Sequence, residues 1–167
     1  GELLRQPDLA RTLSAIRDEG RDGFYEGEVA RNIVAEMHRS GGIISLEDLS
    51  SYRPVERQPL TGTYRGYEII SSAPPSAGGT VLLGMLNTLE HFDLKSKGFG
   101  SSQAVHLFAA AAQRAYADRA EYLGDPDFVT MSIGDLISKA YAGKRALSID
   151  STHATLSQSI KAGVFHG

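Results

Sequence analysis

Four carboxylates lie close together in the stretch Ala115–Phe128, AYADRAEYLGDPDF: Asp118, Glu121, Asp125 and Asp127. Hard cations such as Ca²⁺ bind several oxygen ligands, so this cluster is a candidate metal site, although it lacks the loop spacing of an EF-hand. Arg114 lies four residues before Asp118 and Arg119 adjoins it, a spacing that favours ion pairs. Asp125 can also hydrogen-bond the turn after Gly124. We therefore predict a structural role for the cluster.

A glycine-rich segment, SAPPSAGGT at Ser72–Thr80, leads directly into an expected helix. Backbone N–H groups at such a helix start can hold an anion or an oxyanion. The segment matches neither a P-loop nor a dinucleotide fingerprint, because the lysine and the spaced glycines of those motifs are absent. We predict a rigid corner between a strand and a helix.

Histidine gives little support for catalysis. The histidines are His38, His91, His106, His153 and His166. None pairs at i,i+4 on a helix with a glutamate, so a zincin-type site is not indicated. His38 and His91 fall in the last turns of expected helices, where a partial positive charge suits the helix dipole. A Ser-His-Asp triad assembles in space and stays open, but the chain has no G-x-S-x-G elbow to support it.

Helices are expected to carry most of these residues. An apolar stripe of Leu9, Leu13 and Ile16 predicts the first helix, and a similar stripe predicts the second. Ser45 and Asp48 form a capping-box pattern that opens a third. The region up to residue 52 is therefore expected to form a helical hairpin.

The pattern changes to strands after Pro54. We predict a β-hairpin of Pro59–Tyr64 and Tyr67–Ser71, with Arg65-Gly66 as its tight turn. A lone hairpin is marginally stable in water, so these strands are expected to belong to a larger sheet. The rest of that sheet is not recognisable in the sequence, which suggests a truncated chain.

Three helices are expected after the glycine-rich corner. The first is apolar and buried, and the second is alanine-rich, with Ser102 as its expected cap, and runs to about Leu123. A capping-box pattern at Ser132 predicts a third helix, which continues to about Ala146. From Asp150 onward the residues are mostly polar and are expected to form a mobile tail.

Composition excludes several classes of protein. The chain has 167 residues, 41% of them hydrophobic, and a net charge of −3. Binding to nucleic acid normally needs a basic patch, and no run rich in lysine or arginine occurs. The absence of cysteine excludes disulfides and thiol catalysis. No apolar run approaches the roughly 20 residues of a membrane span, and the N-terminus lacks the features of a signal peptide.

Several separated motifs together resemble the large subunit of the gamma-glutamyltranspeptidase (glutathione hydrolase) family. They are, in order, LARTLSAIRDEGRDGFYEGEVA, GGIISLEDLSSY, PLTGTYRGYEIISSAPPSAGG and AYADRAEYLGDPDF. The resemblance runs from about Leu3 to Ile149. One departure is mild: Ser76 and Ala77 precede the glycine pair, where the family often has two serines.

The resemblance implies part of an N-terminal-nucleophile hydrolase. Its expected fold class is α+β, a mostly helical segment with a β-hairpin that belongs to an αββα sandwich. Residues 1–149 would be the C-terminal half of the large-subunit region, and residues 150–167 a flexible pre-cleavage linker. The precursor, a zymogen, would cleave itself, and the new N-terminal threonine of the small subunit would attack the gamma-glutamyl amide of glutathione. The remainder of the large subunit and the small subunit are the implied partners, and no organic cofactor is required. By the same resemblance the enzyme would be periplasmic or extracellular.

The resemblance places no catalytic residue within the chain. The family's nucleophile lies in a T-T-H-x-S-V-like segment, and Ser151–Leu156, STHATL, is similar to it. We reject Thr152 as the nucleophile, because no valine-rich strand follows it and the last helix directly precedes it. Arg5 and Arg11 do not correspond to the family's substrate-binding arginine, which would lie before Gly1. The isolated chain is therefore expected to be inactive.

Two alternatives remain open. Relatives within the same fold act on poly-gamma-glutamate or on acylated β-lactam precursors, and the residues that choose the substrate would lie outside this chain. A stand-alone helical interaction module is the alternative from another class. It would fold by itself, whereas a fragment with an unfinished sheet would expose apolar surface and associate.

Overall fold

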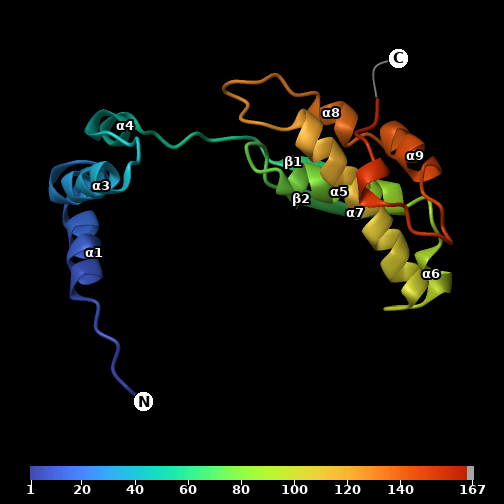
Figure 1. The fold of residues 1–167 in the computed structure, drawn as a ribbon, viewed down its shortest axis with the longest axis horizontal. Coiled ribbons are helices and arrows are strands. Elements are labelled where there is room, and N and C mark those ends of the chain that lie inside the picture. Colours follow the sequence, from blue (N-terminus) through green and yellow to red (C-terminus); the bar gives the residue numbers. More distant parts are fainter. Residues whose placement is uncertain (165–167) are drawn as a thin grey trace. The chain divides into compact units, whose positions relative to one another are not determined.

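The structure, a computed structural model, describes residues 1–164. The chain forms two compact units, Gly1–Glu56 and Arg57–Gly167 (Figure 1). The sequence did not predict this division. The expected boundary between residues 149 and 150 stays a prediction.

The first unit is helical. It contains α1 (Pro7–Glu19), α2 (Asp22–Tyr25), α3 (Gly27–Ser40) and α4 (Leu46–Ser51). The predicted helices are present, and the residues between the first two add the short helix α2. The apolar stripe of α1 is largely uncovered, because Leu9, Leu13 and Ile16 keep 48%, 56% and 37% of their surface exposed.

Polar contacts join α2 to the end of α4. The guanidinium of Arg21 donates to the backbone carbonyls of Ser50 at 2.5 Å and Tyr52 at 3.1 Å. The Tyr25 and Tyr52 rings stack with their centroids 5.3 Å apart. The capping box predicted at α4 is confirmed, because Asp48 N–H donates to Ser45 Oγ and Ser45 N–H donates to the Asp48 carboxylate. These contacts hold the short helices together.

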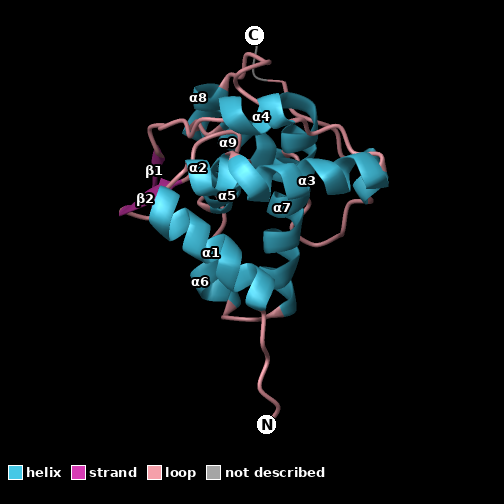
Figure 2. Cartoon of the chain, turned by 90° about the vertical axis from the view of Figure 1, so that its left-hand side faces the viewer, coloured by secondary structure: helices cyan, strands magenta, loops and turns pink. Residues whose placement is uncertain are grey.

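The second unit begins with the predicted hairpin. Strands β1 (Leu60–Tyr64) and β2 (Tyr67–Ser71) pair antiparallel, with Tyr64 opposite Tyr67. Both turn residues have positive φ, 50° at Arg65 and 87° at Gly66, which is the conformation that two-residue hairpins favour. Both strands contact α5 (Gly78–Leu89), and they are the strands seen among residues 1–164 (Figure 2).

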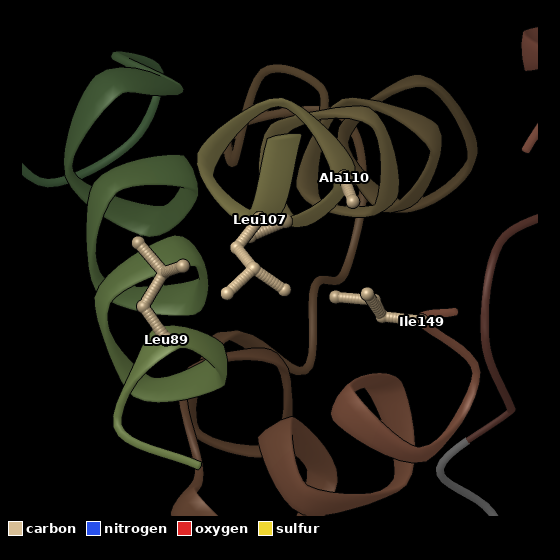
Figure 3. Close-up of a cluster of buried hydrophobic side chains, with 5 residues drawn as sticks. Leu89, Leu107, Ala110 and Ile149 are labelled. Carbon is tan, nitrogen blue, oxygen red and sulfur yellow. The ribbon is translucent and has the colours of Figure 1, made fainter. Parts of the chain in front are cut away.

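The core of the second unit lies where α5 meets the long helix α7 (Ser102–Tyr122). Leu89 and Leu107 face each other, with Ala110 and Ile149 beside them (Figure 3). Alanines on α7 allow the close approach, and Ala111 is 1% exposed. Ser101 rather than Ser102 caps α7, since its Oγ accepts from Ala104 N–H at 3.1 Å. The short helix α6 (Leu94–Lys97) precedes α7.

The prediction of a single helix from Ser132 to about Ala146 is wrong. The structure has two shorter helices, α8 (Ile133–Leu136) and α9 (Lys139–Leu147). Ser138 interrupts the pattern, because its backbone is extended and its Oγ accepts from Tyr141 N–H as the cap of α9. A 3₁₀ turn, η1 (Ser157–Ser159), lies in the segment that follows.

The fold is thus mixed: mostly helix, with a small two-stranded antiparallel sheet. Within residues 1–164, no helix combines the length and the apolar character that crossing a bilayer requires.

Candidate functional site

Asp118, the first member of the carboxylate cluster, is buried in an ion pair. It lies within α7, and its Oδ1 is 3.1 Å from Nη2 of Arg145 on α9. The two side chains are only 11% and 10% exposed. Ion pairing was predicted from the sequence, but with the neighbours Arg114 and Arg119. The actual partner comes from another helix.

Arg114 instead joins α7 to the end of α9. Its Nε donates to Ser148 Oγ at 2.6 Å, its Nη2 donates to the Ser148 carbonyl, and its Nη1 donates to the Ala110 carbonyl at 3.0 Å. Arg145 donates to the carbonyl of Arg114 at 3.0 Å. Burial lowers the pKa of the Arg114 guanidinium, and the positive charge of Arg145 lowers it further.

Two tyrosines complete this buried polar cluster. Burial raises the pKa of Tyr141, and the nearby carboxylate of Asp118 raises it further, so its phenol is neutral at neutral pH. Tyr122 donates from its hydroxyl to the backbone carbonyl of Gly163 at 2.7 Å. The N–H of Gly163 donates to Asp118 Oδ1 at 2.8 Å. The cluster therefore binds the chain that follows α9.

The other three carboxylates do not join Asp118. Asp125 accepts from the N–H of Asp127 at 3.0 Å, the turn role predicted for it. Asp127 forms an ion pair with Arg57 at 2.9 Å. Glu121 is exposed near the end of α7. Over residues 1–164, no three histidine or acidic side chains are grouped so that they could hold a metal ion.

The glycine-rich segment is the strand-to-helix corner that the sequence predicted. It joins β2 to α5, and its Gly79 packs so tightly that a Cβ there would lie 2.3 Å from the Ser72 carbonyl oxygen. A hollow of about 350 Å³ separates Pro75 and Ala77 from the end of α7 at Arg119–Asp125. Residues of the two most distinctive sequence motifs therefore line the same hollow.

The four histidines among residues 1–164 lie in different segments of the fold. His38 lies in the last turn of α3, as predicted, and His91 follows α5 with its ring near Gly143. His106 Nε2 hydrogen-bonds the Asp150 carbonyl oxygen at 2.8 Å. His153 is discussed below, and His166 lies outside the described residues. Arg11 pairs with Asp8 on the exposed side of α1, and Arg5 precedes that helix.

Thr152 belongs to an exposed local turn. Its hydroxyl and its N–H both donate to Asp150 Oδ1, at 2.7 and 2.8 Å, and its Oγ1 is 2.9 Å from His153 Nδ1. These hydrogen bonds, with the hydroxyl of Thr152 first, hold the pKa of Asp150 well below its usual range. The Thr152 hydroxyl donates to this carboxylate, and a carboxylate with a lowered pKa is a weak base, so Asp150 is poorly suited to activate that hydroxyl.

The sequence reasoning missed Tyr122, Arg145 and Gly163. Tyr122 lies four residues after Asp118 on α7, so a shared helix face was a signal for that residue. Arg145 and Gly163 are brought to the cluster by tertiary folding alone.

The chain matches the family model described as Gamma-glutamyltranspeptidase over residues 1–165. It is 48% identical to the glutathione hydrolase proenzyme of Escherichia coli over 98% of this chain and 28% of that protein. The chain therefore spans less than a third of that relative's length.

Comparison with solved structures indicates the same family. The gamma-glutamyltranspeptidase of Helicobacter pylori superposes with a TM-score of 0.91 at 48% identity, over 98% of this chain and 47% of that one. The cephalosporin acylase of Bacillus halodurans superposes with a TM-score of 0.80 at 31% identity, over 90% of this chain and 27% of that one. From its sequence and its fold, this chain belongs to the gamma-glutamyltranspeptidase family.

Proposed function

We propose that residues 1–167 form part of the large subunit of a gamma-glutamyl hydrolase and transferase. The enzyme would cleave the gamma-glutamyl amide of glutathione and related compounds. It would pass the glutamyl group to water, an amino acid or a peptide. The observation that carries this proposal is the agreement of both sequence and fold with a gamma-glutamyltranspeptidase over nearly the whole chain.

The chemistry would be nucleophilic catalysis by a threonine of the small subunit. A proenzyme would cleave itself before that threonine, whose freed α-amine would then serve as its base. The hydroxyl would attack the gamma-glutamyl carbonyl, and an acyl-enzyme would form as the amine product leaves. Water or an acceptor amine would then release the glutamyl group. The remainder of the large subunit and the small subunit are the partners that this scheme requires.

Contacts around Thr152 support a nucleophile elsewhere. Thr152 and His153 lie in a turn stabilised by Asp150, and the side chains of His153 and Asp150 are 83% and 51% exposed. Such a turn excludes no water, and the carboxylate to which the Thr152 hydroxyl donates is a weak base. In this proposal the isolated chain is inactive.

The hairpin would extend a sheet of an αββα sandwich. One face of β1 is half-buried against α5, and a two-stranded hairpin by itself is marginally stable. Further strands beside it would come from the remainder of the enzyme. The proposal also places the enzyme in the periplasm or outside the cell, as the family resemblance suggests.

Acylase activity is the second candidate, because a cephalosporin acylase shares the fold over 90% of the chain. Such an enzyme would accept an acylated β-lactam precursor, and a related one poly-gamma-glutamate. The fold agrees better with a gamma-glutamyltranspeptidase, at a TM-score of 0.91 against 0.80, and this favours a gamma-glutamyl donor. Membership of an enzyme family argues against a stand-alone helical interaction module.

A comparison of donors tests this proposal. The complete protein would be assayed with a gamma-glutamyl anilide, with poly-gamma-glutamate and with a glutaryl β-lactam, each with and without an acceptor dipeptide. We expect kcat/KM for the anilide to exceed that for the β-lactam by about a hundredfold or more, since polar recognition of a substrate group discriminates strongly. A higher kcat/KM for the β-lactam would establish the acylase alternative instead.

A further inference from the structure

The segment after α9 follows α7 through hydrogen bonds at three places. His106 bonds the carbonyl of Asp150, and Gln113 Nε2 donates to Ser157 Oγ at 2.9 Å. Farther along α7, Asp118 and Tyr122 both bind Gly163. The segment therefore runs parallel to α7.

The course of this segment is shortened by turns. From His106 to Asp118, α7 advances about 18 Å at about 1.5 Å per residue. A fully extended chain from Asp150 to Gly163 would span more than 40 Å, at about 3.3 Å per residue. The bends at residues 151–153 and the 3₁₀ turn η1 take up the difference. The position of Gly163 thus depends on its own contacts rather than on a taut chain.

Both backbone groups of Gly163 are bound by side chains. Asp118 Oδ1 accepts its N–H at 2.8 Å, and the Tyr122 hydroxyl donates to its carbonyl at 2.7 Å. The Asp118 carboxylate is shared with Arg145, at 3.1 Å, in a nearly buried position. Charge-assisted hydrogen bonds of this kind are about twice as strong as neutral ones.

Only glycine fits at position 163. A Cβ there would lie 2.4 Å from the Tyr141 hydroxyl oxygen and 2.9 Å from Cδ of Arg145. The Arg145 side chain is held by its pair with Asp118 and by its bond to the Arg114 carbonyl. A methyl group would therefore displace the backbone from the narrow space beside Tyr141 and Arg145, here called the notch. The notch selects one residue type and fixes its orientation.

We propose that Asp118, Tyr122 and Gly163 form an anchor that positions the following chain for self-cleavage of the precursor. This inference rests on the proposed function. In self-cleavage the threonine hydroxyl adds to the preceding carbonyl carbon, and the C–N bond breaks. The amide nitrogen takes the proton and becomes the α-amine, and water then hydrolyses the resulting ester.

The anchor acts by restricting the chain before the reacting peptide bond. Intramolecular reactions depend steeply on how closely the reacting groups are held, and release of a tether lowers their effective concentration. Asp118 and Tyr122 are positioning residues in this scheme. Once cleavage has occurred, the anchor has no further role in turnover.

The test uses the complete precursor with Gly163→Ala or Tyr122→Phe. The matched controls are Gly134→Ala, where a Cβ meets nothing within 4 Å, and Tyr116→Phe, an exposed tyrosine of the same helix. The conversion of precursor to subunits is followed over time by gel electrophoresis and intact mass. The processed enzymes are then compared by kcat and KM on a gamma-glutamyl anilide and by their melting temperatures.

We expect self-cleavage about tenfold slower in Gly163→Ala and several-fold slower in Tyr122→Phe, because the latter loses the hydrogen bond to the Gly163 carbonyl while the backbone of Gly163 still fits. The controls should cleave at the unchanged rate, and kcat and KM of all processed enzymes should agree within about twofold.

Three other results have distinct meanings. If the unchanged precursor does not cleave itself, the proposed function fails. If it does, but both anchor variants cleave at the control rate, the anchor is refuted. A parallel loss of melting temperature and kcat in both variants would assign these residues a purely structural role, and this too would overturn the proposal.

Discussion

Asp118 shows how far local spacing predicts an ion pair. The residue types and spacing on α7 correctly indicated pairing, but a one-dimensional pattern favours neighbours such as Arg114. The structure pairs Asp118 with Arg145 and leaves Arg114 to bind Ser148. The partner depends on how α7 and α9 pack, which no spacing within one helix encodes. Gly163 was unpredictable for the same reason.

Removal of one member of the buried pair should be costly. Asp118→Ala leaves the guanidinium of Arg145 buried without its carboxylate, and we expect a loss of about 3–5 kcal/mol in the free energy of unfolding. Asp127→Ala breaks a partly exposed pair with Arg57 and should cost less than about 1 kcal/mol. Urea unfolding of the two variants measures both values. Equal losses would show that Asp118 is not effectively desolvated.

Among the helices and strands, those with strong local signals were predicted best. The hairpin was placed to within one residue, because the Arg65-Gly66 turn and the strand pattern are both local. The helix predicted from Ser132 was wrong, because Ser138 competes as a cap within the same apolar pattern. The glycine-rich corner was recognised, but the hollow that it shares with the end of α7 arises from tertiary folding.

The contact between α5 and α7 should depend on Leu107. This side chain is 1% exposed in the core, so Leu107→Ala should lower the free energy of unfolding by about 2–5 kcal/mol. Val105 lies on the same helix but is 58% exposed, and Val105→Ala should change stability by less than about 1 kcal/mol. Thermal or urea unfolding of the two variants measures both changes in the free energy of unfolding. A small loss for Leu107→Ala would mean that the core relaxes around the cavity.

Acid should weaken the connection between the hairpin, α5 and α9. A hydrogen bond from Lys139 lowers the pKa of Glu90 below its ordinary value of 4.5, and the backbone N–H of Arg65 lowers it further. Because the folded pKa is the lower one, this stabilisation is present above pH 4.5 and is lost as pH falls through the folded pKa.

Glu90→Gln tests this dependence, since it removes the titrating group. Urea unfolding is measured from about pH 3 to about pH 7, a range that spans the unperturbed carboxyl pKa values. The variant should lose less stability in acid than the unchanged protein. Lys139→Met should have the same effect, and the double variant should add little to either. An unchanged acid slope in both single variants would rule out a contribution from this pair.

For the molecule as a whole, the order of separated motifs was more informative than any single site. The resemblance to gamma-glutamyltranspeptidases, drawn from four segments, is confirmed by the family match over residues 1–165. The division after Glu56 was not predicted, because the linker near Pro54 was interpreted as the start of the strand region. The αββα sandwich stays a prediction, since its remaining strands would come from other parts of the enzyme.

Hydrolysis of a gamma-glutamyl anilide by three preparations tests the assignment of the chemistry most directly. They are the complete protein, the same protein with Thr152→Ala, and the chain of residues 1–167. We predict equal turnover by the first two after self-cleavage and none by the third, because the proposed function assigns the reaction to a threonine outside these residues. Turnover by the chain of residues 1–167, or loss of turnover in the complete protein with Thr152→Ala, would contradict this assignment.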